Sequence, residues 1–415
     1  MFETLPRALR DNPVLAGHAR FCDLVLAVRE TGARRWRIAI RDGAASVSEA
    51  DAADAAIVIE ATPAAWRQFA AAAPPPGYQA LTAMFTTGEF TVSGDVLAFF
   101  RHLKLIEALF QSIRPPRAAP PAAAGALEVR IEPVTGRYLH LAIAGRPHRL
   151  YFEEAGQGIP LLCLHTAGSD GRQFRAVLND AAITSRYRVI AFDLPWHGKS
   201  SPPSGFQNEI YALTTDRYVD TVMAVKAALG LERPVVMGCS IGGRAVLHLA
   251  LRHGKALRAC IGLQSALYAE PGNRYGSDMS QLHRPDVDGA EVGAASVASL
   301  IAPQSPEAER WETLWHYMQG GPGVFMGDLV YYFADGDMRN GMARGIDTAQ
   351  CPLYLLSGEY DVSATPAMGE ALAREVGAQH FEVMREMGHF PMSENPAKFL
   401  GYLRPVLEKI SATTH

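Results

Sequence analysis

Apolar and polar residues alternate near the start of the chain with the period of two that half-buried strands show. Residues 36–41 (Trp-Arg-Ile-Ala-Ile-Arg) follow this pattern, an Asp-Gly pair interrupts it, and residues 44–47 lead into a second strand. An Asp-Gly pair between two such runs is typical of a β-hairpin. Residues 56–60 and 88–93 predict two further strands.

Helical spacing occurs between and after these strands. Thr62 is the expected N-cap of a helix that runs to Phe69, with Pro63 at its first position. Apolar residues then recur with the helical period from Val96 to Phe110. These elements predict a small α+β domain over residues 1–113.

A run rich in proline and alanine, residues 114–127, follows this domain and is typical of a semi-rigid spacer. The rest of the chain, residues 128–415, is predicted to form a second domain. Its apolar runs alternate with amphipathic helices, which indicates an α/β fold with a mainly parallel sheet. Strands are expected near residues 136–154, 161–164, 188–193, 234–237, 257–264, 353–357 and 381–384.

The alternation of strands and helices stops between about residues 266 and 350. Helical segments rich in aromatic residues and methionine replace it, which predicts a helical cap over the sheet. We expect about half of these aromatic side chains to shape a substrate pocket, and we choose Trp311 and Trp315 as substrate contacts, together with Phe390 outside the cap.

One serine follows a buried strand directly and stands between small residues. The segment is Gly238-Cys-Ser-Ile-Gly-Gly243, and it follows the apolar run 234–237. Small residues permit a sharp turn from strand to helix, and such a turn lifts a serine hydroxyl above the edge of a sheet. The pattern therefore predicts Ser240 as a nucleophile.

Two further side chains are expected at the same edge of the sheet. Asp361 follows the predicted strand that starts at Leu353, and His389 follows the strand that starts at Phe381. Parallel strands deliver their C-terminal loops to one side, where α/β proteins bind ligands. The order serine, acid, histidine fits a catalytic triad of Ser240, Asp361 and His389.

A loop of small residues after the strand 161–164 completes the pattern. Its Ala167 is expected to direct a backbone N–H toward the reaction centre, and the N–H of Ile241 follows the nucleophile at a helix N-terminus. Together these two groups predict an oxyanion hole.

With these motifs, residues 128 to 412 resemble the α/β-hydrolase superfamily. Residues 188–200 resemble its Asp-x-Pro-Gly-x-Gly-x-Ser turn, with Trp196 in place of the first glycine, so we expect that loop to be built differently. Thr166 likewise stands where glycine is common in the oxyanion loop. The resemblance implies a helical cap inserted before the strand that carries the acid.

Residues 15 to 112 resemble the sterol-carrier-protein-like lipid-binding domain. The cues are Asp54-Ala-Ala-Ile-Val-Ile, Pro63-Ala-Ala-Trp66 and Gly88-Glu-Phe-x-Val-x-Gly94-Asp95. This resemblance implies an apolar cavity for a lipid. The alternative, which we favour, is that the apolar side chains form the core: Phe85, Phe90, Phe99, Phe100, Leu103, Leu109 and Phe110.

Composition sets limits on function. The 415 residues carry a net charge of −4 with acids and bases interspersed, which argues against a nucleic-acid partner. The five cysteines read as buried thiols of a reducing compartment, no spacing indicates a metal site, and no cofactor is expected. Without a signal-like N-terminus or a membrane-length apolar run, a cytoplasmic location is the expectation.

The predicted reaction is acyl transfer to water from a small-molecule ester, thioester or lactone, with a hydrophobic substrate as one option. Hydrolysis of a carbon–carbon bond in an aromatic ring-cleavage product is the alternative, although that branch commonly has tryptophan after the catalytic histidine, where this chain has Phe390. A non-catalytic lipid carrier and a homodimer through the front domain stay open. Arg244 and Arg339 could hold an anionic substrate, but a structural or surface role is favoured for each. Asp335 and Asp337 are weaker candidates than Asp361 for the acid. Structural or solvated roles are expected for His165, His197 and Glu386.

Overall fold

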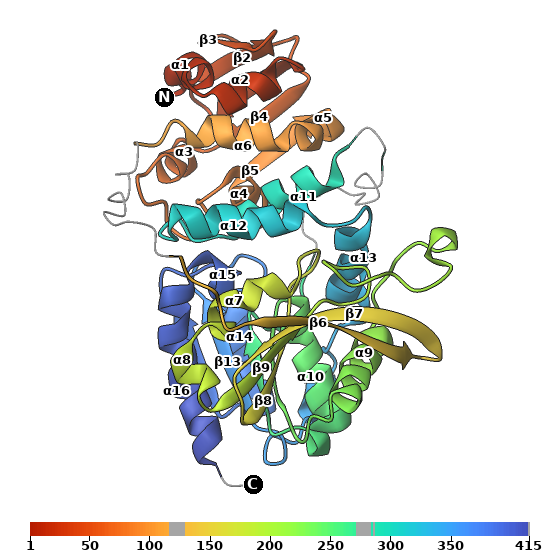
Figure 1. Cartoon of the computed structure of the whole chain (residues 1–415). Coiled ribbons are helices and arrows are strands. Elements are labelled where there is room, and N and C mark those ends of the chain that lie inside the picture. Colours follow the sequence, from red (N-terminus) through yellow and green to blue (C-terminus); the bar gives the residue numbers. More distant parts are fainter. Residues whose placement is uncertain (116–128, 271–283, 285–286, 414–415) are drawn as a thin grey trace. The chain divides into compact units, whose positions relative to one another are not determined.

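The computed structural model describes residues 1–115, 129–270, 284 and 287–413, and it divides into two compact units (Figure 1). The first unit comprises residues 1–130 and 272–299, and the second comprises residues 131–271 and 300–415. Almost all of the predicted spacer lies outside the described residues, as does part of the predicted cap.

Five strands and a set of short helices form the first unit. The sheet has the order β3–β2–β1–β4–β5, and only β1 and β4 run parallel. The strands are β1 (Asp23–Glu30), β2 (Arg35–Arg41), β3 (Ala44–Ser48), β4 (Ile57–Ala61) and β5 (Phe90–Gly94). The helices are η1 (Phe2–Thr4), α1 (Leu5–Asp11), α2 (Pro13–Ala19), α3 (Pro63–Phe69), α4 (Leu81–Thr87), α5 (Val96–Arg101), α6 (Leu103–Gln111) and α11 (Gly289–Ala298).

The predicted hairpin turn and the predicted helix N-cap of the first unit are both confirmed. The hairpin between β2 and β3 has Asp42 at φ 49° and Gly43 at φ 79°, the positive values that a two-residue turn requires. The Thr62 hydroxyl accepts the N–H of Ala65 and so caps α3.

The single helix expected from residue 96 to 110 is instead two helices, α5 and α6, because the backbone of His102 leaves the helical region of φ and ψ.

The apolar residues of the first unit gather in one core. Phe2 lies at its centre, with ring contacts to Trp36, Trp66 and Phe110. All seven apolar side chains that the sterol-carrier resemblance raised as cavity candidates are members of this core. The resemblance itself stays a prediction.

Helix α11 belongs to the first unit, although it comes from the segment predicted as cap. Its Ala295 joins the core, and Glu291 pairs with Lys104 of α6 at 2.5 Å. Directly after α11, the carbonyl of Ser299 accepts a hydrogen bond from Gln79 at 2.9 Å. The front unit is therefore built from two separate stretches of chain.

The second unit holds an eight-stranded sheet of order β14–β13–β11–β10–β8–β9–β7–β6. Only β6 and β7 are antiparallel to their neighbours, as the predicted fold requires. The strands are β6 (Thr135–Ile143), β7 (Arg146–Ala155), β8 (Ile159–Leu164), β9 (Tyr187–Phe192), β10 (Val235–Cys239), β11 (Ala259–Leu263), β13 (Leu353–Gly358) and β14 (His380–Met384).

Helices cover both faces of this sheet, which is why its central strands are buried along their whole length. On one face, alternate residues of β8, β10 and β11 share a core with side chains of α7, α8 and α16, whose helices lie together in Figure 1. On the other face, α10 packs on β10 and β11. The helices include η2 (Gly171–Phe174), α7 (Arg175–Leu178), α8 (Ala181–Thr184), η3 (Phe206–Asn208), α9 (Thr215–Ala228), α10 (Ile241–His253), η4 (Gly254–Ala256), α14 (Pro366–Val376), α15 (Pro391–Glu394) and α16 (Pro396–Ala412).

Between β11 and β13 the second unit carries helices in place of strands. They are α12 (Glu307–Met318), α13 (Val324–Val330), the π-helix η6 (Tyr331–Asp335) and η7 (Met342–Gly345). These helices are the part of the predicted cap that the second unit retains. Among the described residues, no helix combines the length and the apolar character needed to cross a membrane.

Candidate active site

Ser240 occupies a strained turn between β10 and α10. Its backbone has φ 59° and ψ −113°, a conformation that residues with a side chain rarely adopt. The flanking glycines make the turn possible. A Cβ on Gly238 would lie 2.4 Å from the backbone of Gly242, and a Cβ on Gly242 would lie 2.6 Å from the carbonyl oxygen of Leu164. Glycine is therefore required at positions 238 and 242, because a larger side chain there would collide with the neighbouring backbone.

Asp361 and His389 are in direct contact. Asp361 Oδ2 lies 2.7 Å from His389 Nδ1, and both side chains are buried. The other carboxylate oxygen accepts the N–H groups of Ser363 and Ala364, at 2.7 and 3.1 Å, which fixes the carboxylate in the turn after β13. Because Nδ1 faces the carboxylate, Nε2 is the nitrogen left to exchange a proton with a reacting group.

Hydrogen bonds fasten the turn at Ser240 to the loop that carries His389. Cys239 Sγ donates to the carbonyl oxygen of His389 at 3.1 Å. Gln264 donates to the Gly388 carbonyl at 2.7 Å and accepts the N–H of Gly358, so it links the ends of three strands. Ser240 Oγ and His389 make no hydrogen bond to each other in this conformation, a looseness that unliganded sites of this kind often show.

Glu394 fixes the loop that carries His389 by accepting backbone hydrogen bonds from it. The sequence alone did not predict this role. The side chain is fully buried and accepts N–H groups on both sides of the histidine, from Gly388 at 2.5 Å and Phe390 at 3.2 Å. Ala302 N–H and the Ser305 hydroxyl are its other donors. Burial raises the pKa of Glu394 to about 7, against the effect of these four donors.

The loop after β8 leaves one backbone donor free. Thr166 N–H donates to Gln173 Oε1 at 3.0 Å, and Gly168 N–H donates to Asp328 Oδ2 at 2.8 Å. Between them, the N–H of Ala167 has no partner among the described residues. Ile241 begins α10, so its N–H has no partner within the helix either. Both predicted oxyanion donors are therefore unused.

The two departures from the usual family pattern have structural explanations. Trp196 adopts φ 76°, in the left-handed region that favours glycine, so this loop holds a tryptophan in a backbone conformation that side chains rarely adopt. Its ring contacts Phe206 and Tyr211. The Thr166 hydroxyl contacts Tyr317 OH at 2.5 Å, which ties the oxyanion loop to α12.

Asp328 of α13 joins the two loops that flank the site. Besides Gly168, its carboxylate contacts His197 Nε2 and Tyr211 OH, each at 2.8 Å. Burial opposes the charging of His197, but Asp328 outweighs it and raises the pKa of that imidazole. The neighbouring His165 is different, because burial lowers its pKa to about 4. Both histidines thus serve structural contacts, as predicted.

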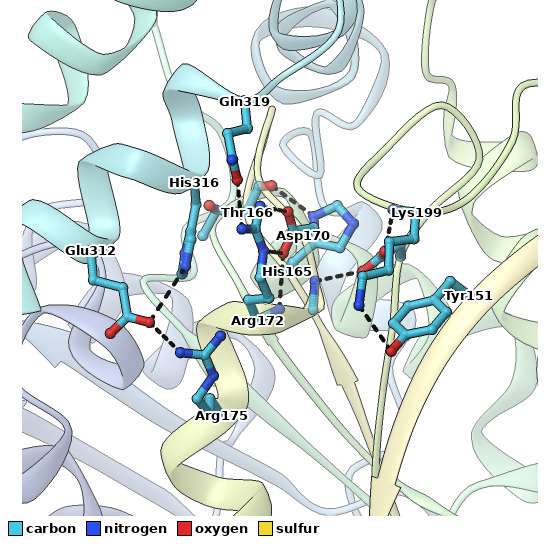
Figure 2. A network of polar contacts seen from close by, with 12 residues as sticks. Tyr151, His165, Thr166, Asp170, Arg172, Arg175, Lys199, Glu312, His316 and Gln319 are labelled. Atoms are coloured by element: carbon cyan, nitrogen blue, oxygen red, sulfur yellow. Dashed lines mark hydrogen bonds and ion pairs between the residues drawn. The ribbon is translucent and has the colours of Figure 1, made fainter. Parts of the chain in front are cut away.

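A polar network connects the oxyanion loop with α12 (Figure 2). Arg172 forms a two-pronged pair with Asp170, at 2.8 and 2.6 Å, and donates to Gln319 Oε1 at 2.6 Å. Arg175 pairs with Glu312 at 2.6 Å. The segment after β8, from Thr166 to the start of α7, is therefore fixed to α12 and the residue after it by several polar contacts.

The predicted substrate contacts fall into two groups. Phe390 is buried, and its ring lies 5.0 Å from that of His389 and 5.5 Å from that of Tyr317. Trp311 and Trp315 are 60% and 53% exposed on α12, so the structure does not bring them to His389. Tyr317 is the aromatic residue of α12 that reaches this region.

The remaining polar residues are engaged elsewhere. Asp335 accepts the N–H of Thr215, and Asp337 pairs with Arg339 at 2.6 Å. Glu386 is exposed and pairs with Lys398. None of these contacts involves the Asp361–His389 pair, in agreement with the sequence analysis.

Comparisons with known proteins place the second unit in a family. The chain is 31% identical over 121 residues to a 2-hydroxymuconate semialdehyde hydrolase of Pseudomonas sp. (28% of this chain and 40% of the relative). It is 23% identical over 273 residues to a pimeloyl-[acyl-carrier protein] methyl ester esterase of Neisseria meningitidis (60% and 93%). The structure of an enol-lactonase from Burkholderia xenovorans superposes with a TM-score of 0.54 at 17% identity (66% and 100%). The model of the alpha/beta hydrolase family matches residues 161–401, more than half of the chain, and the protein belongs to that family.

Proposed function

We propose that this enzyme hydrolyses a carboxylic ester, thioester or lactone through an acyl-enzyme on Ser240. The observation that carries the proposal is the 2.7 Å contact between Asp361 and His389, beside the strained turn of Ser240. A serine, an imidazole and a buried carboxylate in this order are the parts of a catalytic triad.

The steps follow from the roles of these groups. His389 Nε2 takes the proton of the Ser240 hydroxyl, and Asp361 stabilises the imidazolium that forms. The serine oxygen attacks the carbonyl carbon, and the N–H groups of Ile241 and Ala167 receive the negative charge on the carbonyl oxygen. Each such donor contributes on the order of 3 kcal/mol to the transition state. His389 then protonates the leaving group, and water releases the acid by the same steps.

Carbon–carbon bond hydrolysis is the second candidate. The 31% identity to a 2-hydroxymuconate semialdehyde hydrolase favours it over part of the chain, whereas the esterase relative aligns over a longer region. Both reactions use the same three residues here, so substrate tests separate them. A purely non-catalytic carrier would have no use for the Asp361–His389 contact.

The test is hydrolysis of a panel of esters, thioesters and lactones, with a vinylogous diketone included for the second candidate. Ser240→Ala is expected to lower kcat by about 10⁴-fold or more, and Asp361→Asn by a similar factor. Ser265→Ala is the matched control, because this buried serine at the end of β11 donates to the Gly243 carbonyl and has no role in the steps above. Hydrolysis that survives Ser240→Ala would refute the proposal.

A further inference from the structure

Unpartnered polar atoms are concentrated in one part of the second unit. Among the described residues, ten buried side-chain nitrogen or oxygen atoms lack a hydrogen-bond partner, and five of the ten belong to Tyr218, Arg244, His248 and Tyr331. We call these four residues the Arg244 cluster. Ring contacts join Tyr331 to Tyr218 and to His248, at 5.5 and 6.2 Å.

Arg244 carries the charge of this cluster. The residue is 1% exposed, and only Nη1 has a partner, the Gly336 carbonyl at 2.9 Å. Nε and Nη2 are buried without any partner. A guanidinium stays charged even where burial lowers its pKa, as it does here. Burying a charge without a counter-ion costs several kcal/mol, so this arrangement calls for an anion.

Among the described residues, no carboxylate forms a hydrogen bond or ion pair with Arg244, although the charge of Asp337 acts on it from a distance. Asp335 and Asp337 are the carboxylates on the segment that faces Arg244, and they are engaged with Thr215 N–H and with Arg339 respectively. His248, the imidazole of the cluster, has its pKa lowered to about 4 by burial and is neutral at pH 7. Within the described part of the chain, the guanidinium of Arg244 therefore has no anionic partner in direct contact.

The cluster adjoins the candidate triad on two sides. Arg244 lies one helical turn after Ser240, and its N–H donates to the Ser240 carbonyl at 2.8 Å. The guanidinium lies 5.6 Å from the ring centre of Tyr332, whose hydroxyl contacts Ser363 Oγ at 3.2 Å. Ser363 N–H in turn donates to Asp361. Arg244 of α10 is thus linked through Tyr332 and Ser363 to the loop that carries Asp361.

The donor set fits a carboxylate. Two guanidinium N–H groups and the hydroxyls of Tyr218 and Tyr331 are donors, and an arginine fork matches the two oxygens of a carboxylate. Tyr331 also opens the π-helix η6, a rare element that is often found at functional sites.

We propose that the Arg244 cluster is a subsite for a carboxylate of the substrate, so that the enzyme prefers esters that carry a second, ionised carboxyl group. This inference rests on the function proposed above and specifies its substrate class.

The first test compares monoethyl glutarate and monoethyl adipate with ethyl valerate and ethyl hexanoate, which lack the carboxylate. Wild type is expected to prefer the carboxylate esters by at least about tenfold in kcat/KM. Arg244→Met should abolish that preference. Arg339→Met is the matched control and should retain it, because Arg339 is already paired with Asp337. No preference in wild type, or a preference that survives in Arg244→Met, overturns the inference.

The second test measures binding without catalysis. Adipate is expected to raise the Tm of Ser240→Ala, because a ligand that binds the folded state stabilises it. The neutral hexane-1,6-diol should not, and the shift should vanish in Ser240→Ala/Arg244→Met. An Arg244-dependent shift without any ester hydrolysis would refute the proposed function and keep the subsite. Ser240-dependent hydrolysis with no adipate shift refutes the subsite alone.

Discussion

Glu394 shows how a single buried carboxylate fixes the loop that carries His389, the proposed catalytic base. Its two oxygens accept the N–H groups of Gly388 and Phe390, so the backbone on both sides of His389 is fixed. Burial of this carboxylate raises its pKa to about 7. The residue contacts no reacting atom and acts through the placement of the imidazole.

The pKa of Glu394 predicts how stability depends on pH. The Glu394 carboxyl binds a proton more tightly in the folded state than in the unfolded chain, where its pKa is near 4.5. This proton therefore contributes most to the free energy of unfolding below pH 4.5, and the contribution is lost as pH rises through 7. The total is on the order of 3 kcal/mol. In wild type, the free energy of unfolding is expected to fall between pH 5 and pH 8 in part because Glu394 loses its proton. Glu394→Gln should remove that part of the fall, and urea denaturation at the two pH values measures it.

Glu386→Gln is the control for that measurement, since Glu386 is exposed and close in sequence. It should keep the pH dependence of wild type. A Glu394→Gln protein with the wild-type slope would show that the carboxylate does not titrate in this range.

At the residue scale, the sequence predicts those groups whose signal is local. Ser240 stands between glycines, and Asp361 and His389 each follow an apolar strand, so their positions could be predicted without knowledge of the fold. Asp328 could not, because its partners Gly168, His197 and Tyr211 lie far away in sequence. Glu394 could not either, because no short pattern marks a carboxylate that accepts backbone N–H groups of its own loop. The left-handed backbone of Trp196 could not be predicted either, because a tryptophan carries no sequence signal for it.

The glycines around Ser240 act at the scale of elements, where β10 meets α10. A Cβ at Gly238 would overlap the first turn of the helix. Gly238→Ala is therefore expected to lower the free energy of unfolding by about 1 to 3 kcal/mol and to reduce hydrolysis by displacing Ser240. Thermal unfolding and ester hydrolysis measure the two effects.

Gly401 in α16 provides the contrasting substitution, because a Cβ there would meet no atom within 4 Å. Gly401→Ala should stabilise the protein by about 0.5 to 1 kcal/mol, since alanine favours a helix. Equal effects of the two substitutions would contradict the steric explanation of the turn.

Elements with a strong periodic signal were predicted, and the others were not. The strands of the central sheet are continuous apolar runs and lie where expected. Strand β1 was missed because its place in the middle of the first sheet buries nearly every residue, so its sequence does not alternate. The break between α5 and α6 at His102 was missed because the apolar period continues across it.

At the scale of the whole molecule, α11 changes the division of the chain. The proline- and alanine-rich composition predicts a domain boundary near residues 114–127. No pattern in the sequence indicates that residues 289–298 belong to the first unit. The cause is physical: Ala295 covers apolar surface of a core built from residues far away in sequence. Such a contact leaves no periodic pattern of its own.

Ala295→Asp tests this arrangement in the full chain. A carboxylate buried in the first core is expected to destabilise that unit by several kcal/mol, seen as an earlier unfolding transition in calorimetry. Ala290→Asp, at the N-terminus of the same helix, should have little effect or stabilise slightly, because an acid is favourable there. An unchanged transition in Ala295→Asp would show that α11 does not complete the first unit.

The central claim is that one hydroxyl, that of Ser240, performs the chemistry. The most direct measurement is reaction of the full-length protein with a fluorophosphonate, followed by peptide mapping in a mass spectrometer. We expect one phosphonylated residue, Ser240, and loss of labelling in both Ser240→Ala and His389→Ala. Modification at another residue, or a wild-type protein that stays unmodified while it hydrolyses esters, would contradict the account.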